Sequence, residues 1–147
     1  MKSTISETSP GIEVIRPSRA PYSSLFSRRE AEQIARSLLE HFGLEDVSLE
    51  LQLTGDFGIA ELNRCFLGLV GPTNVLSFPE EDEEGFLGSI VVSMEAVSRE
   101  AHLYGQTGAG HFLRLLAHSV LHLAGHEHGP LMDELTESAV DSLAPDL

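Results

Sequence analysis

Histidines supply the clearest chemical signal in this sequence. Five of the seven lie between positions 111 and 128, and His118, His122 and His128 have the spacing of metal ligands. On a helix, His118 and His122 lie one turn apart on the same face. Gly125 allows the chain to leave that helix through a left-handed turn, which brings His128 back to the same point. Three neutral imidazoles leave a tetrahedral zinc ion one open position for water, so the pattern predicts one catalytic Zn2+ per chain.

Polar residues near this cluster are candidates for proton transfer or substrate contact. His126 and Glu127 lie inside the turn. Each either supports the site, Glu127 by accepting the second N–H of a ligand imidazole, or is merely exposed. His111 lies seven residues before His118 on the same helical face, where it either contacts substrate or is packed and hydrogen-bonded.

Other reactive side chains are scattered along the chain. Arg64 and Arg114 are candidate phosphate ligands, and Arg64 is also a candidate catalytic residue. His41 and His102 lie near the ends of expected helices, where a cation suits the helix dipole and no further role is needed. Cys65 lies in the middle of an expected helix and is predicted to be a core residue.

Hydrophobic periodicity divides the chain into short strands and longer helices. A capping box formed by Ser27 and Glu30 opens the first helix, which ends at Gly43. The helix at 109–124 is apolar around most of its circumference, as buried helices are. The last helix follows Pro130. Its apolar face carries Leu131, Leu135, Ala139 and Leu143. Strands are expected at 11–16, 47–53, 73–78 and 87–93. Two further helices are expected: one between the turn at 54–56 and Gly68, which carries Ile59, Leu62, Asn63 and Phe66, and one from Ser93 to Tyr104.

These elements predict an α+β fold. It is a single domain with a small mixed sheet of about four strands, packed with helices around a central apolar zinc-binding helix. A length of 147 residues is that of one domain. Residues 1–11 are polar and predicted to be a flexible tail, which leaves 12–147 as one metallohydrolase domain. The acidic run at 80–84 is expected to be a solvated connection rather than a metal site.

Acidic residues dominate the second half of the chain. Residues 1–65 contain 7 basic and 10 acidic side chains, whereas residues 66–147 contain 2 and 13, and the formal net charge is −14. This balance argues against a nucleic-acid binder with a broad basic face, so any RNA contact must be local, metal-assisted or helped by another protein. The single cysteine excludes an internal disulfide framework, and no secretory or membrane segment is indicated, so the cytoplasm is the expected location.

Two segments resemble one known family. The run at 118–128, HSVLHLAGHEH, resembles the zinc signature of the YbeY family of bacterial rRNA-maturation endoribonucleases. Independently, Leu-Asn at 62–63 followed by PTNVLSFP at 72–79 resembles that family's other signature, and residues 87–90 resemble its next strand. The order and separation of the segments also match, so the resemblance covers roughly residues 45–137.

The resemblance implies an α+β hydrolase that cuts single-stranded RNA, with the zinc helix at its centre and His118, His122 and His128 as the zinc ligands. In that family the substrate is ribosomal RNA, notably the 3′ end of the small-subunit RNA, and defective ribosomes are also targeted. Ribosomal RNA, ribosomal particles and other ribosome-assembly proteins are therefore the expected partners, with no membrane and no nucleotide cofactor.

Five positions depart from the family pattern. Phe66 and Leu67 stand where the family has a tyrosine-arginine pair, Ser119 where it has glycine, and Ser89 and Glu127 where it has aspartate. The metal ligands remain, but their polar surroundings are altered. The loss of the arginine and of an aspartate keeps open a non-catalytic alternative, in which zinc stabilises the core of a ribosome assembly factor.

Two questions of chemistry stay open at this level. The nucleophile is either a water whose pKa zinc lowers to about 7, or the RNA 2′-hydroxyl, which would leave a cyclic phosphate. The ligand spacing also matches that of metzincin peptidases. Those enzymes carry a glutamate directly after the first histidine, where this chain has Ser119, and Met132 lies only four residues after His128.

Overall fold

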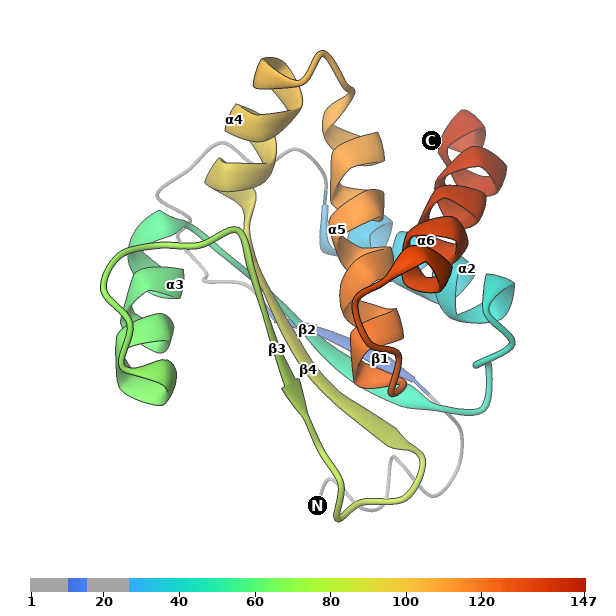
Figure 1. The fold of residues 1–147 in the computed structure, drawn as a ribbon, viewed down its shortest axis with the longest axis horizontal. Helices are drawn as coiled ribbons and strands as arrows, with labels where there is room; N and C mark the ends of the chain where they lie inside the picture. The colour runs from blue at the N-terminus through green and yellow to red at the C-terminus, as the bar shows by residue number, and fades with distance from the viewer. Residues whose placement is uncertain (1–10, 16–26) are drawn as a thin grey trace.

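A computed structural model describes residues 11–15 and 27–147, so the predicted tail lies outside the described residues except for Gly11. None of the described helices is long and apolar enough to cross a membrane. Figure 1 shows the elements, which are β1 (Ile12–Ile15), α2 (Arg28–His41), β2 (Ser48–Thr54), α3 (Asp56–Leu62), the π-helical turn η1 (Asn63–Leu67), β3 (Val75–Pro79), β4 (Phe86–Ser93), α4 (Met94–Leu103), α5 (Gly108–Leu123), α6 (Pro130–Leu143) and the 3₁₀ turn η2 (Ala144–Asp146).

A four-stranded mixed sheet forms the middle of the fold, with strand order β1-β2-β4-β3. β1 pairs in parallel with β2 and β2 with β4, whereas β3 runs antiparallel to β4. The parallel neighbours are joined by crossovers that contain helices, as parallel pairing requires. This arrangement confirms the predicted α+β class, and β1 and β3 form the edges of the sheet.

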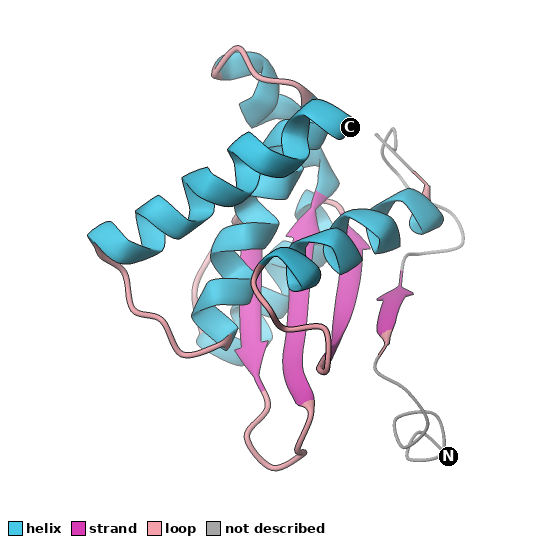
Figure 2. Ribbon diagram, turned by 90° about the vertical axis from the view of Figure 1, so that its right-hand side faces the viewer, coloured by secondary structure: helices cyan, strands magenta, loops and turns pink. Residues whose placement is uncertain are grey.

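Helices cover the two faces of the sheet unequally. α2, α5 and α6 lie on one face and α3 on the other (Figures 1 and 2). Strand alternation explains the division: Ile90 and Val92 of β4 belong to the main core beneath α2, α4, α5 and α6. Val91, between them, packs with Ile59 of α3 and Leu76 of β3 in a smaller cluster. The predicted central helix, α5, therefore lies within the main core.

Local hydrogen bonds set the starts of two helices as expected. Ser27 Oγ accepts a bond from the Glu30 N–H (3.1 Å), and Glu30 Oε1 accepts one from the Ser27 N–H (2.7 Å), which completes the capping box. Ser93 Oγ accepts a bond from the Ala96 N–H (3.2 Å) at the start of α4. Both caps satisfy N–H groups that lack partners within the helix.

The segment after β2 differs from the single helix predicted there. α3 ends at Leu62, and one π-helical turn follows before Gly68, whose φ is 68°. Because the wider turn breaks the 3.6-residue period, Asn63 is buried while Cys65 and Phe66 face solvent. The prediction of Cys65 as a core residue is therefore wrong.

The buried face of α6 agrees with the predicted one at Ala139 and differs from it at Leu131. Met132, Thr136, Ala139 and Val140 are buried, whereas Leu131 is 61 % exposed. The Thr136 hydroxyl donates to the Met132 carbonyl (2.8 Å), and this bond allows a threonine to occupy an apolar face. The placement of Leu131 on the core side is wrong, because α6 packs against α5 through a face that begins one residue later.

The pairing of β3 with β4 leaves no room for a side chain at Gly88. It lies opposite Pro79 with φ 138°, and a Cβ added there would lie 2.2 Å from the Phe78 carbonyl oxygen. We expect Gly88→Ala to lower the free energy of unfolding by about 1–3 kcal/mol, because both the backbone and its neighbour must shift. Urea unfolding measures the change, with Gly11→Ala as control because a Cβ there meets nothing within 4 Å. Equal stability of the two variants would contradict the expectation.

Candidate metal centre

The candidate centre lies at the carboxyl end of α5 and in the turn that follows. His118 and His122 are one turn apart near that end. Gly125 adopts φ 101°, and the N–H groups of Gly125 and His126 donate to carbonyls of the last turn of α5 (3.1 and 3.0 Å). These two bonds form a Schellman motif. The chain therefore reverses direction as predicted, and His128 returns to the helix.

Two of the three imidazoles lie in close contact. Nε2 of His118 is 3.5 Å from Nε2 of His128, and the centroids of these rings are 4.7 Å apart. The His122 ring is farther away, with its centroid 6.2 Å from that of His128. The structure thus brings together the three residues that the sequence pattern selected.

The donor set fits a zinc ion. Zinc–nitrogen bonds of 2.0–2.1 Å at tetrahedral angles place two ligand nitrogens about 3.3–3.4 Å apart, close to the 3.5 Å between His118 and His128. Among the described residues, no group of three or more His, Cys, Asp or Glu side chains is already arranged to hold a metal ion. Complete ligation therefore requires the His122 ring to turn toward the other two.

The surroundings of His118 disfavour a proton on its ring. Burial lowers the pKa of His118 below its ordinary value, and the neighbouring His128 and His122 lower it further, while Asp133 opposes them. Because only the neutral ring ligates a metal, the lowered pKa favours binding. Sequence reasoning did not single out Asp133, although an acidic residue in the first turn of α6 was an available signal.

His111 lies in the first turn of α5, where its side chain packs against α4 and contacts Glu100. Its side chain is 6 % exposed, and its Nε2 lies 2.8 Å from Oε1 of Glu100. The same carboxylate accepts bonds from Asn74 Nδ2 (3.2 and 3.4 Å), and the Tyr104 ring meets the imidazole edge-on. The packed, hydrogen-bonded alternative for His111 is therefore the one observed. Sequence reasoning missed Glu100, because its partners lie in other elements.

The remaining histidines and Glu127 are more exposed to solvent than His111. Glu127 is exposed and forms no hydrogen bond or ion pair with any residue in the described part of the chain. His126 is half-buried in the turn. His41 and His102 are exposed in the last turns of α2 and α4, as expected for cations at helix ends.

Both candidate phosphate ligands are ion-paired. Arg64 on η1 lies 2.7 Å from Glu61, and Arg114 on α5 pairs with Glu137 of α6. Each positive charge is thus partly compensated by a carboxylate. Within the described residues, neither side chain forms a hydrogen bond or ion pair with the histidine cluster.

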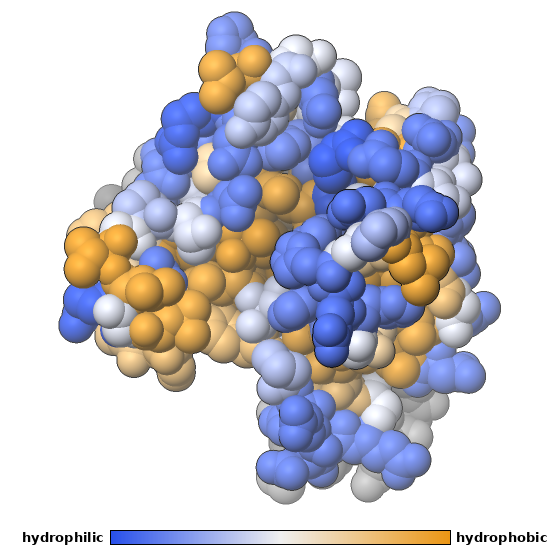
Figure 3. Space-filling view, in the orientation of Figure 1, coloured by the Kyte–Doolittle hydropathy of each residue, from blue (hydrophilic) through white to orange (hydrophobic). Residues whose placement is uncertain are grey.

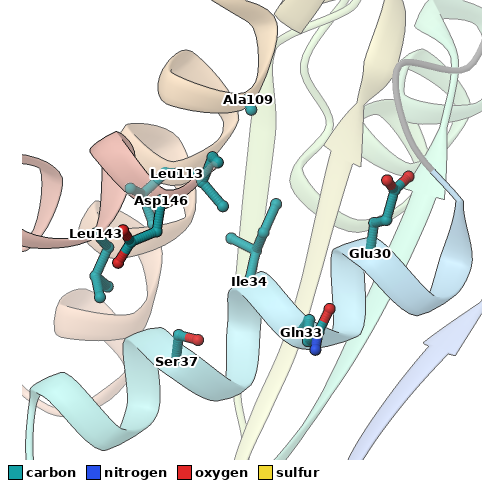
Figure 4. Close-up of a pocket in the computed structure, with 9 residues that line it drawn as sticks. Glu30, Gln33, Ile34, Ser37, Ala109, Leu113, Leu143 and Asp146 are labelled. Atoms are coloured by element: carbon teal, nitrogen blue, oxygen red, sulfur yellow. The ribbon is translucent and has the colours of Figure 1, made fainter.

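A separate hollow of about 530 Å³ lies between α2, α5 and the end of the chain (Figure 4). Ile34, Leu113 and Leu143 line it with apolar surface, and Glu30 and Asp146 add carboxylates. None of its lining residues is a histidine, a cysteine or a cation. The residues with metal-ligating chemistry gather instead at the end of α5.

Comparison with known proteins yields one family. The family described as Endoribonuclease YbeY matches residues 19–141. An Endoribonuclease YbeY of Oleidesulfovibrio alaskensis is 41 % identical, with 76 % of this chain and 80 % of that protein covered. One of Nitratidesulfovibrio vulgaris is 36 % identical, with 84 % and 88 % covered. The solution structure of TM1509 from Thermotoga maritima matches with a TM-score of 0.69 at 26 % identity, covering 92 % of this chain and 90 % of that one.

In metal-free protein we expect His118 to titrate at lower pH than an ordinary histidine, because burial and the neighbouring imidazoles disfavour its charged form. Since its folded-state pKa lies below the unfolded value of 6.5, the unfolded state takes up this proton first. The resulting stabilisation is fully present above that value and is lost as the pH falls through the folded pKa. NMR titration in the presence of a chelator measures it, and a midpoint at or above 6.5 would contradict the expectation.

Proposed function

The chain belongs to the Endoribonuclease YbeY family, and from that premise we propose that it is a zinc-dependent endoribonuclease specific for single strands. We further propose that it acts in maturation of the small-subunit ribosomal RNA 3′ end and in ribosome quality control. The observation that best supports the zinc site is the 3.5 Å approach of two imidazole nitrogens at the end of a buried helix. A third histidine lies one helical turn from the first.

In this proposal His118, His122 and His128 hold the ion. Zinc bound by three imidazoles supplies Lewis acidity, which activates water and offsets the negative charge that develops on a phosphodiester. The chain's own contribution is to orient the ligands, since the core fixes α5 and the Schellman turn fixes the approach of His128. His126 and Glu127, in the same turn, are the titratable groups available to carry a proton to the leaving oxygen.

One observation favours a second candidate, a non-catalytic zinc-stabilised assembly factor. Cleavage benefits from cations beside the phosphate, yet the only basic side chains after residue 64 are Arg99 and Arg114. Both are ion-paired, Arg99 with Asp56 at 3.0 Å and Arg114 with Glu137. These two arginines therefore offer little positive charge for a phosphodiester undergoing cleavage.

The structure shows where Leu67 and Ser89, two of the positions that depart from the family pattern, lie. Leu67 is 53 % exposed on η1 and supplies no charge. Ser89 lies opposite Glu50 in the pairing of β4 with β2, and its hydroxyl donates to Glu50 Oε1 (3.0 Å). An aspartate at position 89 would place like charges on adjacent strands, which is unfavourable. Serine therefore suits this sheet, whatever its effect on catalysis.

A zinc peptidase is poorly supported by the same geometry. Ser119, directly after the first histidine, is 1 % exposed within the core. A metzincin has its general base at this position, and here the side chain is buried away from solvent. Met132, the methionine that follows the histidines by four residues, lies in the buried face of the helix α6.

We place this activity in the cytoplasm, with ribosomal RNA, ribosomal particles and other ribosome-assembly proteins as partners and without a nucleotide cofactor. The net charge of −14 supports the need for help in holding RNA.

Incubation with single-stranded ribosomal RNA tests the proposal. We expect purified protein to contain about one zinc ion per chain and to generate fragments over time. His122→Ala should slow cleavage by more than about 100-fold, because it removes a metal ligand. His102→Ala, on the exposed end of α4, is the matched control and should cleave normally.

Two outcomes would change the conclusion. Stoichiometric zinc without cleavage, together with co-sedimentation with ribosomal particles, would replace the enzyme by the assembly factor. Fragments that end in a cyclic phosphate would identify the RNA 2′-hydroxyl as the nucleophile.

A further inference from the structure

Four exposed apolar side chains follow α3 within five positions. Phe66, Leu67, Leu69 and Val70 are 67, 53, 55 and 97 % exposed, and they occupy η1 and the loop before β3. We call these four residues the apolar ledge. Apolar surface residues are ordinary when scattered singly, whereas a group of this kind marks a surface that contacts a ligand or partner.

The ledge is held in position by contacts beneath it. The buried Asn63 side chain donates to the Gly71 carbonyl (3.0 Å), and the Asn63 carbonyl accepts a bond from the Leu69 N–H (3.2 Å). The Phe66 ring meets the Phe78 ring of β3 edge-on, with centroids 5.6 Å apart. A surface fixed in advance loses little conformational entropy when it binds. π-Helical turns are also frequent at functional sites.

The ledge lies beside the approach to the histidines. Figure 3 shows apolar surface over α3, η1 and the following loop, and this surface continues into a hollow with an apolar floor. α5, α6 and the turn between them form the opposite side of the hollow (Figures 1 and 3). A polymer lying in the hollow can therefore contact both sides at once.

Charge attraction explains little of how an RNA strand would be held there. Residues 27–147 contain six arginines and no lysine. Four of the six are paired with carboxylates: Arg36, Arg64, Arg99 and Arg114. The other two are adjacent at the start of α2. Since few free cations among the described residues can neutralise phosphates, contacts with the bases are the source of affinity that this surface itself can supply.

We propose that the apolar ledge binds unpaired bases of single-stranded RNA by stacking, with Phe66 as the platform. The choice of RNA rests on the proposed function. Stacking on an aromatic ring tolerates any base sequence, because every base has a π face. It requires bases that are free of a duplex, so it also provides selection for single strands. Leu67, Leu69 and Val70 exclude water around the stacked base.

Binding is best measured in the His122→Ala background, which separates binding from cleavage. Fluorescence anisotropy compares a short labelled RNA strand, its duplex, and an abasic strand with the same number of phosphates. We expect the abasic strand and the duplex to bind about 10-fold more weakly or worse. The slope of log affinity against log salt should lie between 0 and about −1, because few phosphates are neutralised.

Substitutions of Phe66 distinguish stacking from general apolar contact. Phe66→Ala should weaken binding by about 5- to 100-fold, and Phe66→Trp should preserve it. Phe66→Leu keeps apolar area but removes the π face, so it should weaken binding nearly as much as alanine. Leu103→Ala, at a 72 % exposed position on α4, is the matched control. Circular dichroism and thermal unfolding check that each variant is folded.

Several results would overturn stacking: an abasic strand that binds as well as the intact strand, an unaffected Phe66→Leu variant, or no RNA binding at all. The ledge would then be a surface for an apolar protein partner. Normal binding and cleavage by Phe66→Ala would overturn the ledge proposal and leave the endoribonuclease intact. Weakened binding by Phe66→Ala, with no cleavage by the native protein, would support the ledge and overturn the enzyme.

Discussion

Burial of α5 is the constraint on which the rest of the structure depends. Phe112, Leu116 and Val120 are fully buried, and the helix packs against the sheet and against α2, α4 and α6. The same helix presents two histidines near its carboxyl end. Because protein interiors are packed as densely as crystals, the core holds the backbone of α5 that carries these two histidines. The backbone positions of His118 and His122 are thus set by the same helix that forms the core.

Arg99, one of the few cations in the described residues, forms an ion pair that stabilises the fold. Arg99 of α4 pairs with Asp56 at the start of α3, and the Ser93 hydroxyl donates to the same carboxylate (2.8 Å). The Arg99 hydrogen bond lowers the pKa of Asp56, partial burial opposes it, and Ser93 adds to the lowering. Glu95 accepts the Asp56 N–H (2.8 Å). These contacts join α3 to α4, so Arg99 and Asp56 serve to hold two helices together.

Features that depend on near neighbours in the chain could be read from the sequence. The capping box at Ser27, the turn at Gly125 and the placement of His118 and His122 one turn apart on a helix are all local, and each occurs where the pattern predicts it. The links of Glu100 to His111 and of Asp133 to His118 join different helices, so they depend on packing. The π-helical turn η1 could not be predicted from the sequence, because the spacing of apolar residues does not distinguish it from continued α-helix.

The outer strands give the sheet little opportunity to grow. β1 has four residues, and β3 has five and ends at Pro79, which has no N–H to donate. Five consecutive acidic residues, 80–84, follow that proline. Short edges, a proline and concentrated like charge are features that hinder the addition of a strand from another molecule. The domain can therefore expose an apolar surface beside η1 and still resist edge-to-edge aggregation at high concentration.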